Sequence, residues 1–149
     1  SSFKYMNAAG IPVVANNIIG FPDETREMVF ETIELNRKYD CDTINAFTFS
    51  PYHGTKLREM ALQRGYIKEE DRVTIYTKDS VLNMPHFSKE EISGLIRTFA
   101  LYVKLPKKYW PRIKVAERDD EEGRKAFAEL AEIYKQYAMN RIDDEEVVC

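Results

Sequence analysis

The stretch that most constrains the fold is Ile11–Glu24, IPVVANNIIGFPDE, which has the pattern of an apolar strand, a glycine turn and an acidic helix start. Its β-branched residues suit a strand buried on both faces of a parallel sheet. Gly20 permits a sharp turn, and Pro22 ends the strand because it lacks an amide donor. Asp23 and Thr25 then offer side-chain oxygens to the free amides of a helix.

Two asparagines, Asn16 and Asn17, interrupt this apolar strand. A buried amide needs hydrogen-bond partners, so we expect polar groups next to the side chain of each asparagine. One interpretation is that at least one of them faces a polar cavity. The other is that they are structural amides that tie neighbouring strands together, and the sequence leaves both interpretations open.

A strand, a helix and a second strand follow one another with short connections. The helix is expected from about Thr25 to Tyr39, and the second strand at Thr43–Ser50. The apolar positions expected on one face of the helix are Met28, Val29, Ile33, Leu35 and Tyr39. This order predicts a βαβ unit, the building block of open α/β sheets and α/β barrels.

Pleat alternation sorts the second strand into two faces. One face holds Ile44, Ala46, Thr48 and Ser50, and the other holds Asn45, Phe47 and Phe49. We expect the large aromatic side chains to pack under helices. The small polar residues Thr48 and Ser50 would then line a cavity with Asn16, Ile18 and Gly20 of the first strand, because ligands of α/β folds bind at the carboxyl ends of the strands.

The rest of the chain is mostly helical in pattern. Thr55 is expected to cap a short helix that ends at Gly65, and the run from Ser88 to Glu91 fits a capping box. The segment between them is less clear, with a short strand expected at Val73–Tyr76. The motif PKKYWP is expected to break the chain into a loop, and a last amphipathic helix is predicted over about 121–140.

Composition limits the partners and the compartment. The 149 residues are 44% hydrophobic and 32% charged, with a net charge of −3. This balance predicts no nucleic-acid partner, and no apolar run is long enough for a membrane partner. Cys41 and Cys149 lie far apart, which favours a reducing, cytoplasmic setting. The sequence has no CxxC, HExxH or Cys/His cluster, so we expect no metal site built by this chain.

Two motifs in this order resemble the second half of a radical S-adenosylmethionine (radical SAM) core domain, most closely the subgroup that often carries a cobalamin-binding domain. The first motif is GIPVVANNIIGFPDETREM and the second is TINAFTFSPYHGTKLREMALQRGYI. In that subgroup a strand ends in a glycine-proline-glutamate-threonine turn, and the next strand ends in a proline-tyrosine-x-glycine-threonine turn. The two motifs cover about the first 67 residues.

The resemblance implies an α/β fold that is a fragment of a partial (β/α)6 TIM-like barrel. This chain would supply strands five and six within residues 1–75, and a mostly helical extension within 76–149. The family's glycine-x-isoleucine-x-glycine pattern falls on Asn16 to Gly20, with asparagine in place of the first glycine. The residues that the resemblance places in the cofactor wall are Asn16, Ile18, Gly20, Thr48, Ser50 and Tyr52.

By the same resemblance, the parent protein would be an Fe-S oxidoreductase or transferase that uses S-adenosylmethionine, a 4Fe-4S cluster and, as an open alternative, cobalamin. The family's CxxxCxxC cluster motif is absent from this chain, so the chain alone is expected to be inactive. Its expected partners are a small-molecule substrate and the missing N-terminal half of the barrel, or a second copy through open strand edges.

Two other hypotheses stay open at this level. One is a non-catalytic half-barrel that acts as a binding or dimerisation module. The other is half of a different α/β barrel enzyme acting on a small phosphorylated or carbonyl substrate. The latter is disfavoured because no lysine, paired carboxylate or glycine-rich phosphate loop lies at either strand end.

Overall fold

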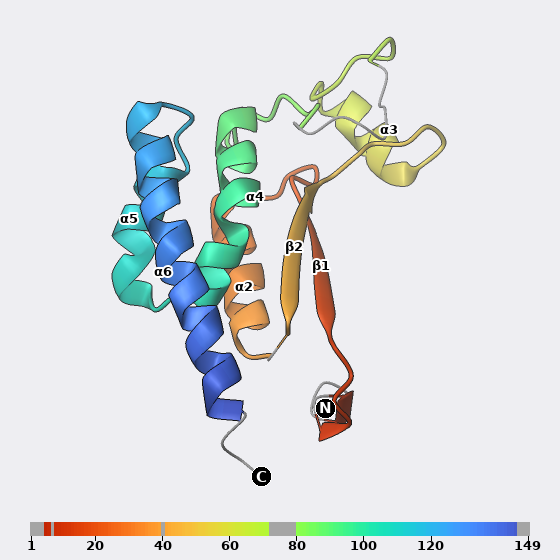
Figure 1. The fold of residues 1–149 in the computed structure, drawn as a ribbon. Helices are drawn as coiled ribbons and strands as arrows, with labels where there is room; N and C mark the ends of the chain where they lie inside the picture. Colours follow the sequence, from red (N-terminus) through yellow and green to blue (C-terminus); the bar gives the residue numbers. More distant parts are fainter. Residues whose placement is uncertain (1–4, 7, 40, 72–79, 146–149) are drawn as a thin grey trace.

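The computed structural model describes residues 5–6, 8–39, 41–71 and 80–145 of the chain, with side chains up to residue 137. It is an α/β structure with a two-stranded sheet and a helical C-terminal part (Figure 1). The elements are β1 (Val14–Ile19), α2 (Arg26–Arg37), β2 (Thr43–Thr48), α3 (Lys56–Gln63), α4 (Lys89–Lys104), η1 (Lys107–Tyr109), α5 (Trp110–Ala116) and α6 (Glu121–Glu145). The strand expected at Val73–Tyr76 lies outside the described residues.

The two strands are parallel, as the βαβ pattern predicted. Each residue of β1 pairs with one residue of β2, from Val14 opposite Thr43 to Ile19 opposite Thr48. Thr25 is the N-cap of the connecting helix α2, and its hydroxyl accepts a hydrogen bond from the Met28 amide. The side chains of two residues that are paired across the ladder point to the same face of the sheet.

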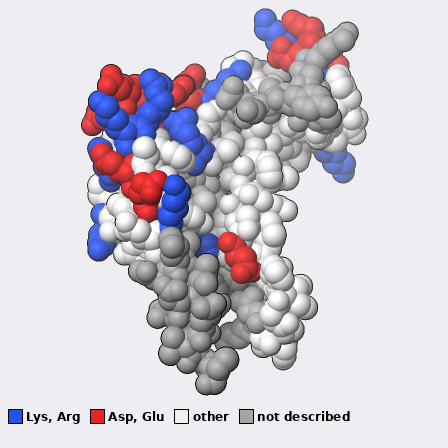
Figure 2. Space-filling view, viewed as in Figure 1, with Lys and Arg blue, Asp and Glu red and all other residues white. Residues whose placement is uncertain are grey.

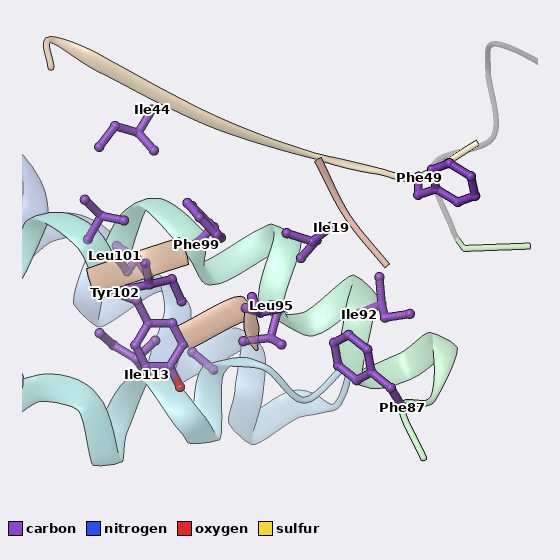
Figure 3. Packing of buried hydrophobic residues seen from close by; sticks show 14 of the residues in the cluster. Ile19, Ile44, Phe49, Phe87, Ile92, Leu95, Phe99, Leu101, Tyr102 and Ile113 are labelled. Carbon is purple, nitrogen blue, oxygen red and sulfur yellow. The ribbon is translucent and has the colours of Figure 1, made fainter. Parts of the chain in front are cut away.

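Helices cover one face of this sheet, and α2 and α4 lie on the same side of it (Figure 1). Ile19 and Ile44 point from the strands toward the helices, where Leu95 and Phe99 of α4 complete the core (Figure 3). The predicted capping box fixes the start of α4, because Ser88 and Glu91 exchange side-chain and backbone hydrogen bonds. Burial of these apolar side chains is the main term that holds the sheet to α4.

The other face of the sheet is exposed, which corrects two expectations. Val14, Ile18 and Phe47 are 54%, 52% and 53% exposed, so the first strand is not buried on both faces. The aromatic side chain of Phe47 does not pack under a helix; instead Ile44 and Ala46 face the helices. The prediction for the second strand was therefore wrong for Asn45 and Phe47, whereas Phe49, just beyond the end of β2, is buried as expected.

The motif PKKYWP does not form the expected loop. Pro106 precedes the short 3-10 helix η1, and Pro111 lies in the first turn of α5, where its missing amide donor costs nothing. Trp110 packs edge-on against Phe30 and Tyr102, with ring centroids 5.4 Å apart in both pairs. The segment therefore closes the core between α2 and α4.

Helices α4 and α5 approach closely at Gly94. A Cβ atom placed on this residue would lie 2.5 Å from the carbonyl oxygen of Glu117, so only glycine fits there. Helix α6 packs against α5 and runs five residues beyond the predicted end, to Glu145. Among the described residues, no helix combines the length and the apolar character needed to cross a bilayer.

Candidate functional site at the open sheet face and strand ends

The open face of the sheet brings together Asn16 and Ile18 of β1 with Asn45 and Phe47 of β2. Asn16 pairs with Asn45 and Ile18 with Phe47 in the ladder. The Asn45 amide donates a hydrogen bond of 3.0 Å to the Asn16 side-chain oxygen. The face therefore presents an amide pair next to an apolar pair, a combination that suits a flat ligand with a polar edge.

No charged residue interrupts this surface. Residues 11–22 and 43–55 contain no Lys, Arg, Asp or Glu. In Figure 2 the surface over the strands is mostly white, with one acidic patch toward its lower end, whereas most charged side chains gather over α5, α6 and the region of α3. An exposed and uncharged sheet face of this kind is typical of a surface that binds a ligand or another protein segment.

Asn17 has a structural role. Its side chain exchanges two hydrogen bonds with Asn36 of α2, at 3.2 and 2.8 Å. The same amide nitrogen donates to the Asn45 carbonyl oxygen at 3.1 Å. For Asn17 the structure thus supports the structural interpretation, since this side chain ties α2 and both strands together on the helix-covered side.

Thr48 lies apart from the open-face residues. It pairs with Ile19 on the helix-covered face, so it does not share a surface with Asn16 and Ile18. Its hydroxyl oxygen is buried and has no hydrogen-bond partner. The expectation that Thr48, Asn16 and Ile18 line one cavity is therefore wrong, because the strand alternation puts them on opposite sides of the sheet.

Gly20 forms the turn at the carboxyl end of β1. Its φ of 87° favours glycine, and a Cβ atom there would meet the Ile92 side chain of α4 at 3.4 Å. The buried Glu24 carboxylate accepts hydrogen bonds from the amides of Gly20 and Phe21. Burial raises the pKa of Glu24, although these two amide donors oppose the rise. Glu24 therefore fixes the backbone at this strand end.

Asp23 braces the same turn rather than capping α2. Its φ is 65°, a conformation that non-glycine residues rarely adopt. Its carboxylate accepts a 2.8 Å hydrogen bond from the Tyr66 hydroxyl and forms a 2.8 Å ion pair with Arg64. His86 places its Nε2 3.1 Å from the Glu24 carbonyl oxygen. Two distant segments, at residues 64–66 and at His86, thus contact this one turn.

The end of β2 lies against the end of β1. The Phe49 amide donates to the Ile19 carbonyl oxygen at 2.8 Å, and the rings of Phe21 and Phe49 lie 4.8 Å apart. In the following turn the Ser50 carbonyl accepts from the Tyr52 amide, and the Tyr52 side chain is 50% exposed. Gly20, Ser50 and Tyr52 therefore belong to one rim formed by adjacent strand ends.

Arg58 holds the second turn in place from α3. This side chain is almost fully buried, and its guanidinium donates to the carbonyl oxygens of Pro51, Glu69 and Asp71. Sequence patterns did not single it out, because an arginine on a short helix usually points to solvent. The buried guanidinium makes the turn at 51–54 part of a fixed rim.

Two surface grooves lie elsewhere on the molecule. One, of about 870 Å³, lies between α4 and α5 and carries side chains of both charges, and the other, of about 740 Å³, follows α2 and Trp110. Neither is lined by a strand residue. Among the described residues, no group of three or more His, Cys, Asp or Glu could hold a metal ion. The open sheet face and its rim are therefore the site that we consider.

The fold and this site define an α/β protein with a parallel βαβ unit and an open, uncharged sheet face. Comparison with known proteins shows distant similarity over part of the chain. The first relative is an uncharacterized methyltransferase of Pyrococcus horikoshii, 39% identical over 88 residues, which cover 59% of this chain and 19% of the relative. The second is a tRNA-2-methylthio-N(6)-dimethylallyladenosine synthase of Anoxybacillus flavithermus, 37% identical over 51 residues, or 34% of this chain and 10% of the relative.

The aligned residues span about a fifth of the first relative and a tenth of the second. No family model and no solved structure matches the chain. These short alignments do not establish the activity of a whole protein that contains this chain.

Proposed function

We propose that this chain is the C-terminal part of a radical SAM core domain, and that its open sheet face forms part of the S-adenosylmethionine-binding wall. The observation that carries the proposal is the geometry of the two motifs. GFPDET and PYHGT follow adjacent parallel strands and form one rim, next to an uncharged face that suits the inside of a barrel. The similarity to proteins named as a methyltransferase and a methylthio synthase supports the same class of reaction.

The open-face residues fit the adenosyl part of S-adenosylmethionine. Ile18 and Phe47 offer half-exposed apolar surface for a ring face, and the paired amides of Asn16 and Asn45 offer donors and acceptors for a polar edge. Gly20, Ser50 and Tyr52 would border this wall at the rim. Thr48 is left out of the proposed wall, because it lies on the other face.

This chain does not supply the ligands of a 4Fe-4S cluster. When bound, a 4Fe-4S cluster supplies the electron that cleaves S-adenosylmethionine reductively. It needs closely spaced thiolates, and the two cysteines here are 108 positions apart, with Cys41 buried. What this chain contributes is binding, orientation and exclusion of water along one wall. In the proposed assignment the cluster ligands belong to the N-terminal half of the parent protein, and cobalamin stays an open addition.

The test uses the parent protein, the longer polypeptide that carries this chain. After anoxic reconstitution with iron and sulfide, and with dithionite as the electron donor, we expect it to cleave S-adenosylmethionine to methionine and 5′-deoxyadenosine or to transfer its methyl group. Asn16→Ala and Ile18→Ala should raise the KM for S-adenosylmethionine. Thr48→Val, on the same sheet and the opposite face, is the matched control and should leave KM unchanged. A parent reading frame without an upstream CxxxCxxC motif would refute the proposal.

A second candidate is a non-catalytic module that binds a partner chain through the same surface. It is favoured by the two-stranded sheet, because in the described part of the chain each strand pairs on one side only. Sedimentation of the 149-residue chain separates the two candidates, since a stable monomer that gains no partner at high concentration counts against the module. A chain that self-associates tightly, and whose parent cleaves no S-adenosylmethionine, would favour it.

A further inference from the structure

We propose that one flank of helix α2, formed by Met28, Thr32 and Leu35, is the docking surface for the helix of a preceding βα unit. This inference rests on the proposed function for the existence of that unit in the parent protein. In the same arrangement, the strand of that unit would pair with the free edge of β1. The occupant is thus a segment of the same polypeptide and not a second copy of the chain.

Helix α2 has two occupied sides. Val29, Ile33 and Asn36 are buried on the sheet side. On a second side, Phe30 contacts the Tyr102 ring with centroids 5.0 Å apart, and Arg37 donates to carbonyl oxygens at the end of α4. These contacts direct the second side of α2 toward α4 and α5.

The third side is the flank proposed for docking. At about 100° per residue, Met28 lies about 200° from Phe30, and Leu35 lies about 200° from Arg37. Both residues therefore point away from α4, and each is 49% exposed. The sequence grouped them with the buried face of α2, and the structure shows that nothing in the described part of the chain covers them.

Met28, Thr32 and Leu35 form a continuous surface against which another helix can pack. Met28 and Leu35 lie two turns apart on the helix, and Thr32, half-buried, lies between them. Large apolar side chains on either side of a smaller residue accept a side chain from a facing helix, as in the packing of ridges into grooves. Two exposed apolar residues at this spacing on a helix of 12 residues predict a packed neighbour.

The direction in which the chain enters β1 indicates where the neighbouring helix lies. Tyr5, Met6 and Ala8 are helical, and this turn closes with Gly10 at a φ of 65° and a hydrogen bond from the Ile11 amide to the Met6 carbonyl oxygen. A helix thus ends just before β1, at the amino end of the sheet (Figure 1). Right-handed crossovers put such a helix on the same face of the sheet as α2, and its strand on the edge of β1 away from β2.

Charge argues against a second copy as the occupant. Glu27 and Glu31, both exposed, border the docking flank of α2. Two copies packed flank to flank would bring these glutamates close to one another, which like-charge repulsion disfavours. The surface instead suits a helix with an apolar face bordered by Lys or Arg.

The test measures the accessibility of this flank in the parent protein. Single variants Met28→Cys and Leu35→Cys are labelled with a thiol reagent under native conditions, and labelling is followed peptide by peptide. Lys125→Cys, at an exposed position on helix α6 and away from α2, is the control. We expect the two flank positions to react at least about tenfold more slowly than the control, because a packed helix must open before they react.

Equal labelling rates at all three positions would overturn the inference. Protection that disappears on dilution would also overturn it, because it would identify a second copy as the occupant. The measurement needs no cofactor. A parent that protects the flank and lacks a cluster motif would therefore refute the proposed function alone, and a parent that cleaves S-adenosylmethionine with an accessible flank would refute this inference alone.

Discussion

At the scale of single residues, the neighbours Asn16 and Asn17 show how one strand position changes the role of a side chain. Asn17 lies on the helix-covered face and shares two hydrogen bonds with the buried Asn36. Asn16 lies on the open face, where its partner Asn45 is within reach of solvent. The same amide group is therefore a structural tie in one position and a solvent-exposed group in the next.

This difference predicts a contrast in stability. Asn17→Ala should lower the free energy of unfolding by about 1–3 kcal/mol, because it leaves the buried Asn36 amide short of a partner. Asn16→Ala should change it by less than about 0.5 kcal/mol, since water can replace the lost bond. Urea unfolding of both variants measures the contrast, and equal losses would show that the open-face amide is also structural.

At the scale of elements, Glu117 at the end of α5 joins three helices. Its carboxylate accepts hydrogen bonds from Arg26 of α2, at 2.9 Å, from the Tyr102 hydroxyl of α4, and from Lys114, at 3.0 Å. Burial raises the pKa of Glu117, but these hydrogen bonds outweigh it, so the net pKa lies below the ordinary value of 4.5. Burial and the same carboxylate raise the pKa of Tyr102.

The lowered pKa of Glu117 determines how the free energy of unfolding changes with pH. The contribution of Glu117 is present above its ordinary pKa of 4.5 and is lost as the pH falls through the lowered folded-state value. Glu117→Gln should therefore cost about 3 kcal/mol at neutral pH and should flatten the loss of stability in acid. Denaturation across this pH range tests the effect. Glu129→Gln, which removes an exposed ion pair with Arg112, is the control and should be nearly neutral.

At the scale of the whole molecule, charge and exposure divide the protein into two sides. The helical side carries dense surface charge, whereas the sheet side carries little (Figure 2). The sheet side exposes the apolar side chains of Val14, Ile18 and Phe47. Such a division is expected of a part that completes its core by contact with another segment.

This division predicts dye binding by the 149-residue chain. The chain should bind a hydrophobic fluorescent dye at its sheet face, and the double variant Ile18→Ser, Phe47→Ser should remove most of that fluorescence. Met60→Ser, at a partly exposed position on α3, should leave it unchanged. Fluorescence that survives the double variant would place the apolar surface elsewhere. Under the proposed assignment, the same face should bind no dye in the parent protein, because the rest of the barrel would cover it.

Local signals in the sequence were sufficient for much of the fold. The caps at Thr25, Thr55 and Ser88 each lie within three residues of the amides that they bind, so helix starts could be predicted directly. The parallel strand pair followed from the length of the connecting helix. The open-face site was found in part, because Asn16 and Ile18 stood out in the strand, whereas Asn45 and Phe47 were assigned to the helix-covered face.

The sequence by itself determined most of the elements, their order and the turns that end the two strands. It could not determine which face of each strand meets the helices, because both faces of β1 and β2 carry apolar side chains and alternation alone cannot rank them. Nor could it separate Met28 and Leu35 from the buried side of α2, since both flank the same apolar stripe. Only the tertiary structure decided these points, because burial depends on which helix packs against which side.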